Sequence, residues 1–328
     1  MLKFGAVTID VSHPSGFASK LLEGDRARYT AVFNDCFRTD EEVEAFSKQF
    51  DAKIYDDLDE MIDNIDLGLV HCCNWDKHLD YVMHFVRKGK PVFVDKPIVG
   101  NMKDLRTIVE LEEKGARILG TSALRYAYEV RDVKAKLTET GTEPIFVSTT
   151  VGVDEFNYAI HAVELICGIM PSDPVSCRFV GTSKVEGAFP AESYLITFAS
   201  GATAIYTAVD KKFLLCHTTV LTNGTMASDM NFTVNNLKLY DAMLPEICNA
   251  MEGLDNLLIP VSEMAKPIKV LLAGKASKQN GGIEVSLDSP LLEETSFDGN
   301  AFEIGYADAA RKAAEAAKKA AEAEAKKQ

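Results

Sequence analysis

The chain has 328 residues, 47% of them hydrophobic and 26% charged, which is the composition of a globular protein long enough for two domains. Its formal net charge is −14 and the sequence contains no basic stripe, which argues against nucleic acid as a partner. No apolar run approaches the ~20 residues that span a bilayer, no signal peptide is recognisable, and the seven cysteines contain no C-x-x-C pair. We therefore expect a cytoplasmic protein with reduced thiols and no contact with a membrane.

Residues 1–125 alternate between short apolar runs and helical patterns. The apolar runs are KFGAVTI, YTAVFND, LGLVHCC, PVFVD and RILGTSAL, and patterns such as TDEEVEAFSKQFDA and HLDYVMHFVRKGK separate them. Thr39 stands ahead of acids and predicts the start of a capped helix. Short apolar strands separated by helices are typical of a parallel, doubly wound sheet. We predict a Rossmann-like dinucleotide-binding domain over residues 1–125.

The pattern changes from about residue 126. A helix over AYEVRDVKAKLTETG precedes alternating runs such as PIFVSTTVGV, ESYLITFAS and ATAIYTAVD, which Gly, Asn and Ser residues join. This pattern predicts an α+β domain over residues 126–308, with a large, mostly antiparallel open sheet that serves substrate binding and oligomerisation. An exposed face of such a sheet favours a homo-oligomer. Residues 309–328 are rich in Ala, Lys and Glu and predict a helical or disordered tail.

The first strand-to-helix turn, TIDVSH, lacks the G-x-G-x-x-G pattern with which such turns hold a pyrophosphate. Asp10 occupies one glycine position, where an unpaired carboxylate would repel the phosphates. Ser12 is a good N-cap, and the helix that follows could still receive an anion, with His13 within reach of the diphosphate. Asp35, after the second strand, is placed to bind the adenine ribose or merely to end the strand. Arg38 leaves room for a 2′-phosphate, so the choice between NAD and NADP stays open.

Polar side chains cluster at the carboxyl ends of the later strands, where ligands bind in an open α/β sheet. They are Asn74, Trp75 and His78 after the third strand, Asp95 and Lys96 after the fourth, and Ser122 and Arg125 after the fifth. A lysine at this rim, held by the proline that follows it, can offer a fixed ammonium group to a substrate hydroxyl. No metal site is expected, because His71, Cys72 and Cys73 are consecutive on a strand and point to opposite faces.

Two blocks of sequence resemble the glucose–fructose oxidoreductase/inositol dehydrogenase (Gfo/Idh/MocA) family. The segment HLDYVMHFVRKGKPVFVDKPI is similar to the family's H-A-x-x-A-x-x-A-L-x-A-G-K-H-V-x-x-E-K-P, with Asp95 in place of the usual Glu. The segment NYAIHAVELICGIMP resembles the family's histidine block, and His161 and Glu164 fall on its histidine and second acid. Asn157 stands where the first acid is expected, unless Asp154 replaces it. The resemblance covers roughly residues 1–290.

The resemblance implies an NAD(P)-dependent oxidoreductase that acts on a secondary hydroxyl of a sugar, cyclitol or related polyol. Lys96 would then polarise the reacting oxygen and His161 would be the general base. Asn157, counted as a third catalytic residue, and Glu164 would orient His161 or the substrate. The residues expected to contact the cofactor are Ser12, His13, Asp35, Asn74, Trp75, His78, Asp95, Lys96, Ser122 and Arg125. Within this set, Trp75 and His78 flank the nicotinamide or cap the next helix, and Arg125 bridges the domains or touches a ligand.

Two other functions stay open at this point. A relative of the family could hold NAD tightly and use it for redox-assisted elimination or hydrolysis of a glycoside. A non-redox member, whose degenerate turn no longer binds a dinucleotide, could serve only to bind a ligand. The missing glycines favour the last alternative, whereas Lys96 and His161 argue against it, because a binding module has no need of an acid–base pair.

Overall fold

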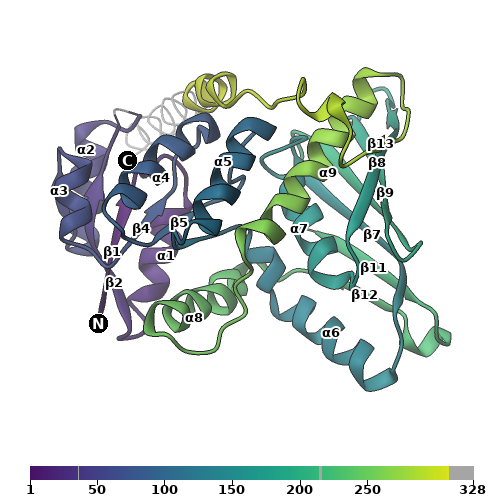
Figure 1. The fold of residues 1–328 in the computed structure, drawn as a ribbon, viewed down its shortest axis with the longest axis horizontal. Helices are drawn as coiled ribbons and strands as arrows, with labels where there is room; N and C mark the ends of the chain where they lie inside the picture. Colours follow the sequence, from purple (N-terminus) through teal and green to yellow (C-terminus); the bar gives the residue numbers. More distant parts are fainter. Residues whose placement is uncertain (36, 214–215, 310–328) are drawn as a thin grey trace, which may run out of the picture.

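The computed structural model describes residues 1–35, 37–213 and 216–309. Apart from residue 309, the predicted tail over residues 309–328 lies outside the described residues. The described chain forms two sheets, each with its own helices, which lie next to one another (Figure 1). The first is a six-stranded sheet and the second a seven-stranded sheet. This arrangement confirms the predicted fold class.

The first sheet has the strand order β3-β2-β1-β4-β5-β6, and all of its strand pairs are parallel. Its strands are β1 (Leu2–Val7), β2 (Ala27–Phe33), β3 (Lys53–Tyr55), β4 (Leu67–Val70), β5 (Val92–Val94) and β6 (Ile118–Gly120). Its helices are α1 (His13–Leu21), α2 (Asp40–Phe50), α3 (Leu58–Asp63), α4 (His78–Arg87) and α5 (Met102–Glu113). Successive strands are added on one side of β1 up to β3 and on its other side from β4 onward, so the strand order reverses between β1 and β4. In doubly wound sheets, the crevice at such a switch point is where a ligand binds.

Local sequence accounts for the tight packing of this domain. Thr39 forms a complete capping box with Glu42 at the start of α2, which confirms the predicted capped helix. The strands carry apolar side chains on both faces because helices cover both. Gly68 in β4 illustrates how closely these layers approach, since a Cβ atom there would lie 2.0 Å from the ring of Phe85 in α4.

The second sheet has the order β12-β11-β7-β10-β9-β8-β13, and only the pair β7 and β10 is parallel among its described strands. Its strands are β7 (Pro144–Val153), β8 (Pro174–Ser183), β9 (Ala191–Phe198), β10 (Thr203–Asp210), β11 (His217–Thr222), β12 (Met230–Thr233) and β13 (Val285–Ser286). Its helices are α6 (Tyr128–Thr140), α7 (Ala159–Ile169) and α9 (Val261–Gln279). Short 3₁₀ helices are η1 (Trp75–Lys77), η2 (Ala123–Tyr126), η3 (Met226–Ser228), η4 (Asn236–Lys238) and η5 (Pro290–Leu292). The predicted, mostly antiparallel sheet is therefore confirmed.

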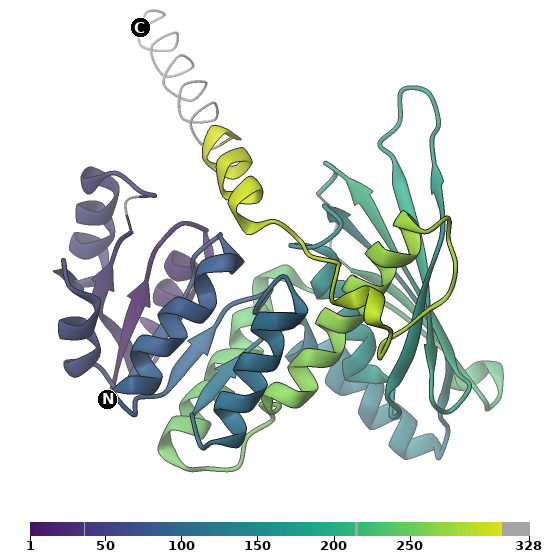
Figure 2. The same cartoon turned by 45° about the horizontal axis from the view of Figure 1, so that its top comes forward.

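Two later segments return to the first sheet and shape its carboxyl edge. Helix α8 (Leu239–Glu252) packs on α1. The C-terminal segment, by which we mean residues 297–309, becomes helical from residue 299 and lies over the N-terminal domain, as Figure 2 shows. Residues from both ends of the chain thus surround the edge at which a ligand is expected.

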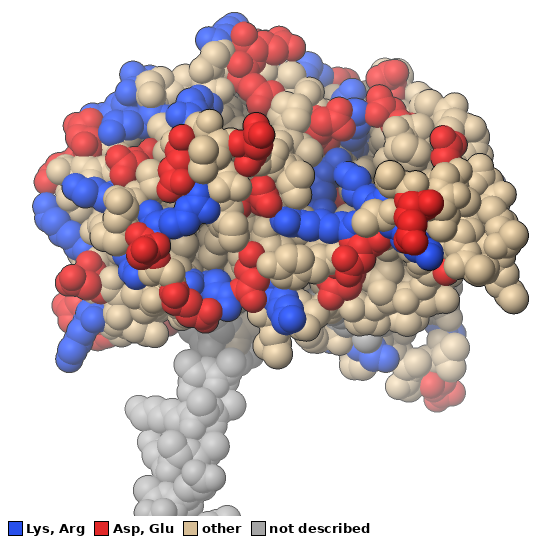
Figure 3. Space-filling view, turned by 90° about the horizontal axis from the view of Figure 1, so that it is seen from below, with Lys and Arg blue, Asp and Glu red and all other residues tan. Residues whose placement is uncertain are grey.

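In the described part of the chain, no helix combines the length and the apolar character needed to cross a membrane. The surface turned toward the viewer in Figure 3 carries Lys and Arg side chains interspersed with Asp and Glu. That face lacks the continuous basic stripe with which proteins neutralise nucleic-acid phosphates.

Candidate active site

A cavity of about 320 Å³ lies where the two halves of the molecule meet. The start of α1, the carboxyl ends of β5 and β6, helix α7 and helix α8 all contribute to its wall. Its polar lining consists mainly of Ser12, His13, Asp95, Lys96, Thr121, Tyr158, His161, Asn236 and Tyr240. A concave site in which a few acid–base groups converge among apolar side chains is the usual form of a small-molecule site.

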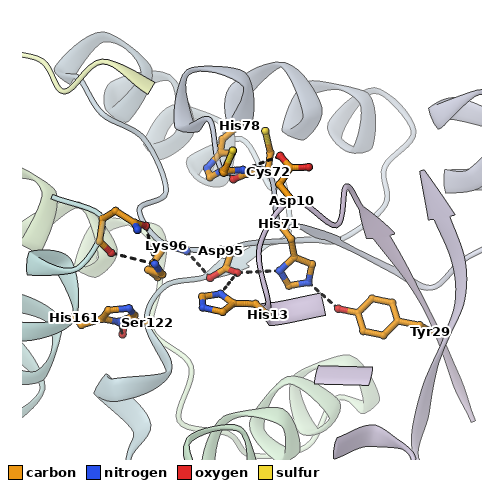
Figure 4. Close-up of polar contacts among 12 residues, drawn as sticks. Asp10, His13, Tyr29, His71, Cys72, His78, Asp95, Lys96, Ser122 and His161 are labelled. Carbon is orange, nitrogen blue, oxygen red and sulfur yellow. Dashed lines mark hydrogen bonds and ion pairs between the residues drawn. The ribbon is translucent and has the colours of Figure 1, made fainter. Parts of the chain in front are cut away.

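Lys96 follows β5 and reaches across the domain boundary (Figure 4). Its Nζ atom donates to Asn157, at 2.8 Å from Oδ1 and 3.1 Å from the backbone oxygen. Burial lowers the pKa of Lys96, although the carboxylates of Asp95 and Asp154 act in the opposite direction. Asn157 therefore holds the lysine in place, and of its two expected partners, His161 and the substrate, it makes no hydrogen bond to His161 among the described residues.

His161 projects from α7, and its Nδ1 atom lies 2.6 Å from the hydroxyl oxygen of Ser122. Burial, followed by the positive charges of Lys96 and His13, holds the pKa of His161 well below its usual range. The imidazole is therefore neutral near neutral pH. Ser122, which the sequence assigned to the cofactor, is the hydrogen-bonding partner of His161.

Glu164, expected to orient His161 or the substrate, is bound to neither of the cavity's histidines but to Arg125 and Thr121. Its carboxylate pairs with Arg125 Nη1 at 2.7 Å and accepts a hydrogen bond from Thr121. Both charged side chains are buried, with 1% exposure for Glu164 and 9% for Arg125. Burial raises the pKa of Glu164, and the charge of Arg125 opposes that rise. The pair joins η2 to α7, so Arg125 bridges elements of the protein and is not placed to touch a cofactor.

Asp95 lies at the centre of a chain of hydrogen bonds. Its Oδ2 atom is 2.6 Å from His13 Nδ1 and 2.9 Å from His71 Nδ1, and Oδ1 accepts the backbone N–H of Lys96 at 2.8 Å. The Nε2 atom of His71 is in turn 2.7 Å from the hydroxyl of Tyr29. Figure 4 shows Asp95 between His13 and His71. Buried Tyr29 carried no signal in the sequence that would distinguish it from a core residue.

The ligand atoms of His13, His71 and Asp95 all lie within 4.8 Å of one another, so that this group could hold a metal ion. The sequence argument against a metal concerned a different set, His71 with Cys72 and Cys73. In the structure, His13 and His71 are each hydrogen-bonded to Asp95, at 2.6 and 2.9 Å. These hydrogen bonds account for the cluster, and we assign no metal to it.

The carboxyl ends of β1, β2 and β4 form a second region, which we call the cofactor edge (residues 8–12, 34–35, 37–38 and 73–77). Asp10 is 1% exposed and its Oδ2 atom accepts the backbone N–H of Cys73 at 3.0 Å. Burial raises the pKa of Asp10. Arg38 donates to the backbone oxygens of Ile9 and Asp10 and pairs with Glu42, so its guanidinium is bound by the chain itself. Three buried oxygens here have no partner among the described residues: Thr8 Oγ1, Asp10 Oδ1 and Asn34 Oδ1.

The C-terminal segment covers the cofactor edge. Asn74 Nδ2 donates to Glu303 Oε2 at 2.8 Å, and Lys77 Nζ pairs with Glu303 Oε1 at 3.1 Å. The indole of Trp75 donates to the backbone oxygen of Phe297 at 2.8 Å and packs on Phe302. Tyr306 also stacks on Phe37, with the two ring centroids 6.1 Å apart.

These contacts test whether the edge fits a dinucleotide. Asp35 stands after β2 where a ribose is held in such folds; its carboxylate now accepts from Tyr81 at 2.9 Å and from Lys77 at 3.2 Å. Asn74 and Trp75, expected to contact the cofactor, are engaged by the C-terminal segment. The edge therefore fits a dinucleotide only when that segment lies elsewhere.

The remaining residues expected to contact the cofactor fall into two groups, those that line the cavity and those that are buried away from it. Ser12 and His13 line the cavity, although Ser12 makes no side-chain capping bond at the start of α1, contrary to the expectation that it is a good N-cap. His78 is 1% exposed, and its ring nitrogens lie 3.1 and 2.8 Å from the backbone oxygens of Ile98 and Cys72. It is therefore structural and does not flank a nicotinamide. The sequence analysis did not single out Tyr240, which lies in α8 and contacts the ring of His13.

Comparison with known proteins agrees with this architecture. The family model GFO_IDH_MocA, described as an oxidoreductase family with an NAD-binding Rossmann fold, matches residues 17–122. The chain is 28% identical over 187 residues to an inositol 2-dehydrogenase of Serratia proteamaculans and 30% identical over 174 residues to one of Paracoccus denitrificans. These matches cover 52% and 49% of this chain and 55% and 51% of the relatives. The chain thus spans about half the length of the curated relatives that it matches.

Solved structures resemble the chain over more of its length. The myo-inositol dehydrogenase of Lactobacillus casei in complex with NAD(H) and myo-inositol has a TM-score of 0.73 at 16% identity, over 89% of this chain and 99% of that chain. The apo scyllo-inositol dehydrogenase of the same organism has a TM-score of 0.72 at 13% identity, over 88% and 99%. At this level of identity the likeness concerns the fold of both halves.

Proposed function

We propose that the chain, whose residues 17–122 match the model of the Gfo/Idh/MocA oxidoreductase family, is an NAD(P)-dependent oxidoreductase acting on a secondary hydroxyl of a sugar, cyclitol or related polyol. The observation that carries the proposal is the single cavity lined by Lys96 from one half of the molecule and His161 from the other. Proton transfer between a substrate hydroxyl and a positioned imidazole is the acid–base work that such an oxidation requires. The inositol 2-dehydrogenases among the relatives support a cyclitol or polyol as the substrate.

The side chains of the cavity suit this chemistry. Lys96, held by Asn157, offers an ammonium group that hydrogen-bonds the reacting oxygen and stabilises negative charge on it. A histidine of the same cavity takes the proton, and His161 is the one that the family resemblance selects. A second imidazole, that of His13, lines the same cavity.

The size of the cavity supports a small substrate and a separate position for the cofactor. A volume of about 320 Å³ is at the lower end of the ~300–1,000 Å³ typical of ligand sites, so it suits a cyclic polyol better than a whole dinucleotide. The cofactor edge would hold the dinucleotide, with Asp35 on the ribose, after the C-terminal segment has moved. When bound, the nicotinamide supplies the hydride acceptor.

One observation favours a second candidate, a non-redox member that only binds a ligand. The C-terminal segment pairs with Asn74, Trp75 and Lys77, which are the groups that a cofactor would otherwise meet. In a protein that never binds a dinucleotide, this cover would be permanent. The two candidates therefore differ in whether the segment can leave.

The unpaired face of the second sheet supports the proposal of a homo-oligomer. Large apolar side chains on its strands are exposed, namely Ile145 in β7, Val175 and Val180 in β8, and Leu221 in β11. Exposed apolar residues on a sheet face are typical of an interface. Light scattering of the purified protein measures the oligomeric state, and a monomer at all concentrations would contradict this part of the proposal.

The test of the function begins with the purified full chain. Denaturation followed by mass spectrometry reveals any tightly held nicotinamide dinucleotide, whose stoichiometric release would favour redox-assisted chemistry on a glycoside. Calorimetric titration with NAD and NADP then measures binding. Absorbance of the reduced nicotinamide, followed with a panel of inositols, sugars and linear polyols, measures oxidation. We expect binding of one cofactor and oxidation of at least one cyclic polyol; no heat with either cofactor would overturn the proposal in favour of the non-redox candidate.

A further inference from the structure

The cavity holds a second imidazole that, unlike His161, is backed by a carboxylate. His13 opens α1, and its Nδ1 atom lies 2.6 Å from Asp95 Oδ2. Its side chain is 22% exposed, whereas that of Asp95 is only 8% exposed. The ring of His13 packs beside Phe17 and meets Tyr240 edge-on, which fixes its plane. His13 therefore faces the cavity on one side and a buried acid on the other.

The hydrogen bonds around Asp95 determine which nitrogen of His13 is free. Although burial alone would raise it, the pKa of Asp95 is held well below its usual range by the neighbouring imidazoles of His13 and His71. An ionised carboxylate only accepts hydrogen bonds, so both imidazoles donate to it from Nδ1. In neutral His13 the lone pair is then on Nε2, for which the described residues provide no hydrogen-bond partner.

The far end of the network supports this assignment. Burial lowers the pKa of His71 and raises that of Tyr29 well above its usual value, so both stay neutral. With its proton on Nδ1, His71 accepts at Nε2 from the hydroxyl of Tyr29, 2.7 Å away. Every polar atom from Tyr29 to Asp95 thus has a defined role, and the carboxylate cannot turn away from His13.

His161 lacks these advantages as a base. Its hydrogen-bonding partner is the neutral hydroxyl of Ser122, and burial, followed by the charge of Lys96, opposes its protonation. A proton taken up by His161 would create a second cation beside Lys96 without a carboxylate against it. A proton taken up by His13 forms an ion pair with Asp95, and a carboxylate in this position both fixes the tautomer and stabilises the imidazolium.

We infer that His13, oriented by Asp95, is the residue that accepts the proton of the substrate hydroxyl, and that His161 binds the substrate by a hydrogen bond. The inference rests on the proposed oxidation of a polyol. In this step the O–H bond of the substrate breaks, a new N–H bond forms at Nε2 of His13, and the charge of the imidazolium is balanced by Asp95. Lys96 stabilises the alkoxide that remains.

The test compares three alanine variants in the full chain, with added imidazole as the readout of a missing base. His13→Ala is expected to lower kcat at least ~100-fold, as loss of a general base does, and to change KM less. Added imidazole should raise the kcat of this variant at least tenfold. His161→Ala should mainly raise KM and show no rescue. His84→Ala is the matched control, because His84 makes the same contact with an acid, Asp59, at 2.7 Å outside the cavity.

A kcat of His13→Ala within threefold of the wild type would overturn the inference, as would rescue by imidazole in His161→Ala instead. Circular dichroism and thermal melting show whether each variant is folded. If His13→Ala does not fold, His13→Gln keeps a hydrogen bond to Asp95 without a basic nitrogen and should give the same loss of kcat.

Failure of the proposed oxidation can be told apart from failure of this inference. If the wild type binds no cofactor and oxidises none of the polyols, the proposed function is wrong. The free nitrogen of His13 can then be tested with diethyl pyrocarbonate, which acylates neutral, accessible imidazoles. Peptide mapping should show modification of His13 before that of buried His71. An unmodified His13 beside a modified His84 would overturn the assignment of its lone pair.

Discussion

Two regions at the carboxyl edge of the first sheet are candidates for ligand binding, and they differ in the partners that their polar side chains have. At the ends of β5 and β6, Lys96, His13 and His161 surround an open cavity of about 320 Å³. At the ends of β1, β2 and β4, the expected ligand groups Asn74 and Trp75 are hydrogen-bonded to the chain's own C-terminal segment. The substrate side is therefore preformed, whereas the cofactor side is closed.

In the proposed reaction, the binding of the substrate and the binding of the cofactor therefore have different free-energy costs. A substrate entering the cavity meets side chains already held by neighbours, as Lys96 is by Asn157, so little ordering has to accompany binding. In the proposed reaction, a dinucleotide would first displace the C-terminal segment, and its apparent affinity would fall in proportion to the fraction of molecules in which the edge is open. Variants on the two sides should accordingly change different quantities, kcat on one and cofactor affinity on the other.

The largest effect is expected from Lys96→Ala. Loss of the ammonium removes the group that stabilises charge on the reacting oxygen, so kcat should fall at least ~100-fold, with the affinity for NAD(P) nearly unchanged. Steady-state kinetics and calorimetry measure the two quantities. Lys103→Ala, at an exposed lysine of the same domain, is the control and should behave as the wild type. A Lys96→Ala enzyme that turns over at a near-normal rate would refute the role of this lysine.

The preformed side could be predicted from the sequence because its signals are local. Lys96 directly precedes Pro97 at the end of an apolar strand, and His161 falls in a recognisable block of a helix. Short strand β3 was missed because Lys53 and Ile54 in it are exposed, which leaves only Tyr55 as a buried position. The pattern of short apolar runs nevertheless sufficed for the doubly wound sheet, since strands covered on both faces are apolar throughout.

The closed side could not be predicted, because its contacts join residues far apart in the sequence. Trp75 and Phe297 are separated by 222 positions, and Asn74 and Glu303 by 229. Nothing in the composition of residues 297–309 indicates which surface they cover. The contacts of Asn157 with Lys96 and of Glu164 with Arg125 were not predicted for a related reason, since a sequence pattern does not reveal which distant side chain a residue meets.

Truncation should open the closed side. A chain ending at Asp298 keeps Phe297, whose backbone accepts from Trp75, but lacks the helical part of the C-terminal segment. Removal of a contact worth about 1.4 kcal/mol changes an affinity tenfold, so we expect NAD(P) to bind about tenfold more tightly. A chain ending at residue 309 is the matched control, because it keeps the whole segment and should bind as the full chain does. Equal affinity of both truncated chains would mean that the segment does not compete with the cofactor.

A smaller effect, on the preformed side, is expected from pH. Burial lowers the pKa of Lys96, with Asp95 and Asp154 opposing that change, so its ammonium loses the proton at a lower pH than an ordinary lysine. Since the charged form is needed, kcat should decline on the alkaline side before the pH reaches the usual pKa of a lysine. Lys96→Arg keeps its charge at every accessible pH, so its residual activity should show no such decline. The same alkaline decline in both enzymes would assign it to another group.

The smallest effect is expected from Glu303→Gln, which tests how the C-terminal segment is held. The variant loses the ion pair with Lys77, but Gln can still accept from Asn74. Because the side chains of Lys77 and Glu303 are 34% and 21% exposed, the pair should contribute no more than ~1 kcal/mol, and NAD(P) affinity should rise about twofold to fivefold. Glu293→Gln, which removes the exposed pair with Arg106, controls for the change in net charge. If Glu303→Gln matched the full truncation, this one ion pair would hold the segment, and the packing of Phe302 on Trp75 would contribute little. A value between those of the full chain and the truncated chain would instead show that aromatic packing and charge hold the cofactor edge closed together.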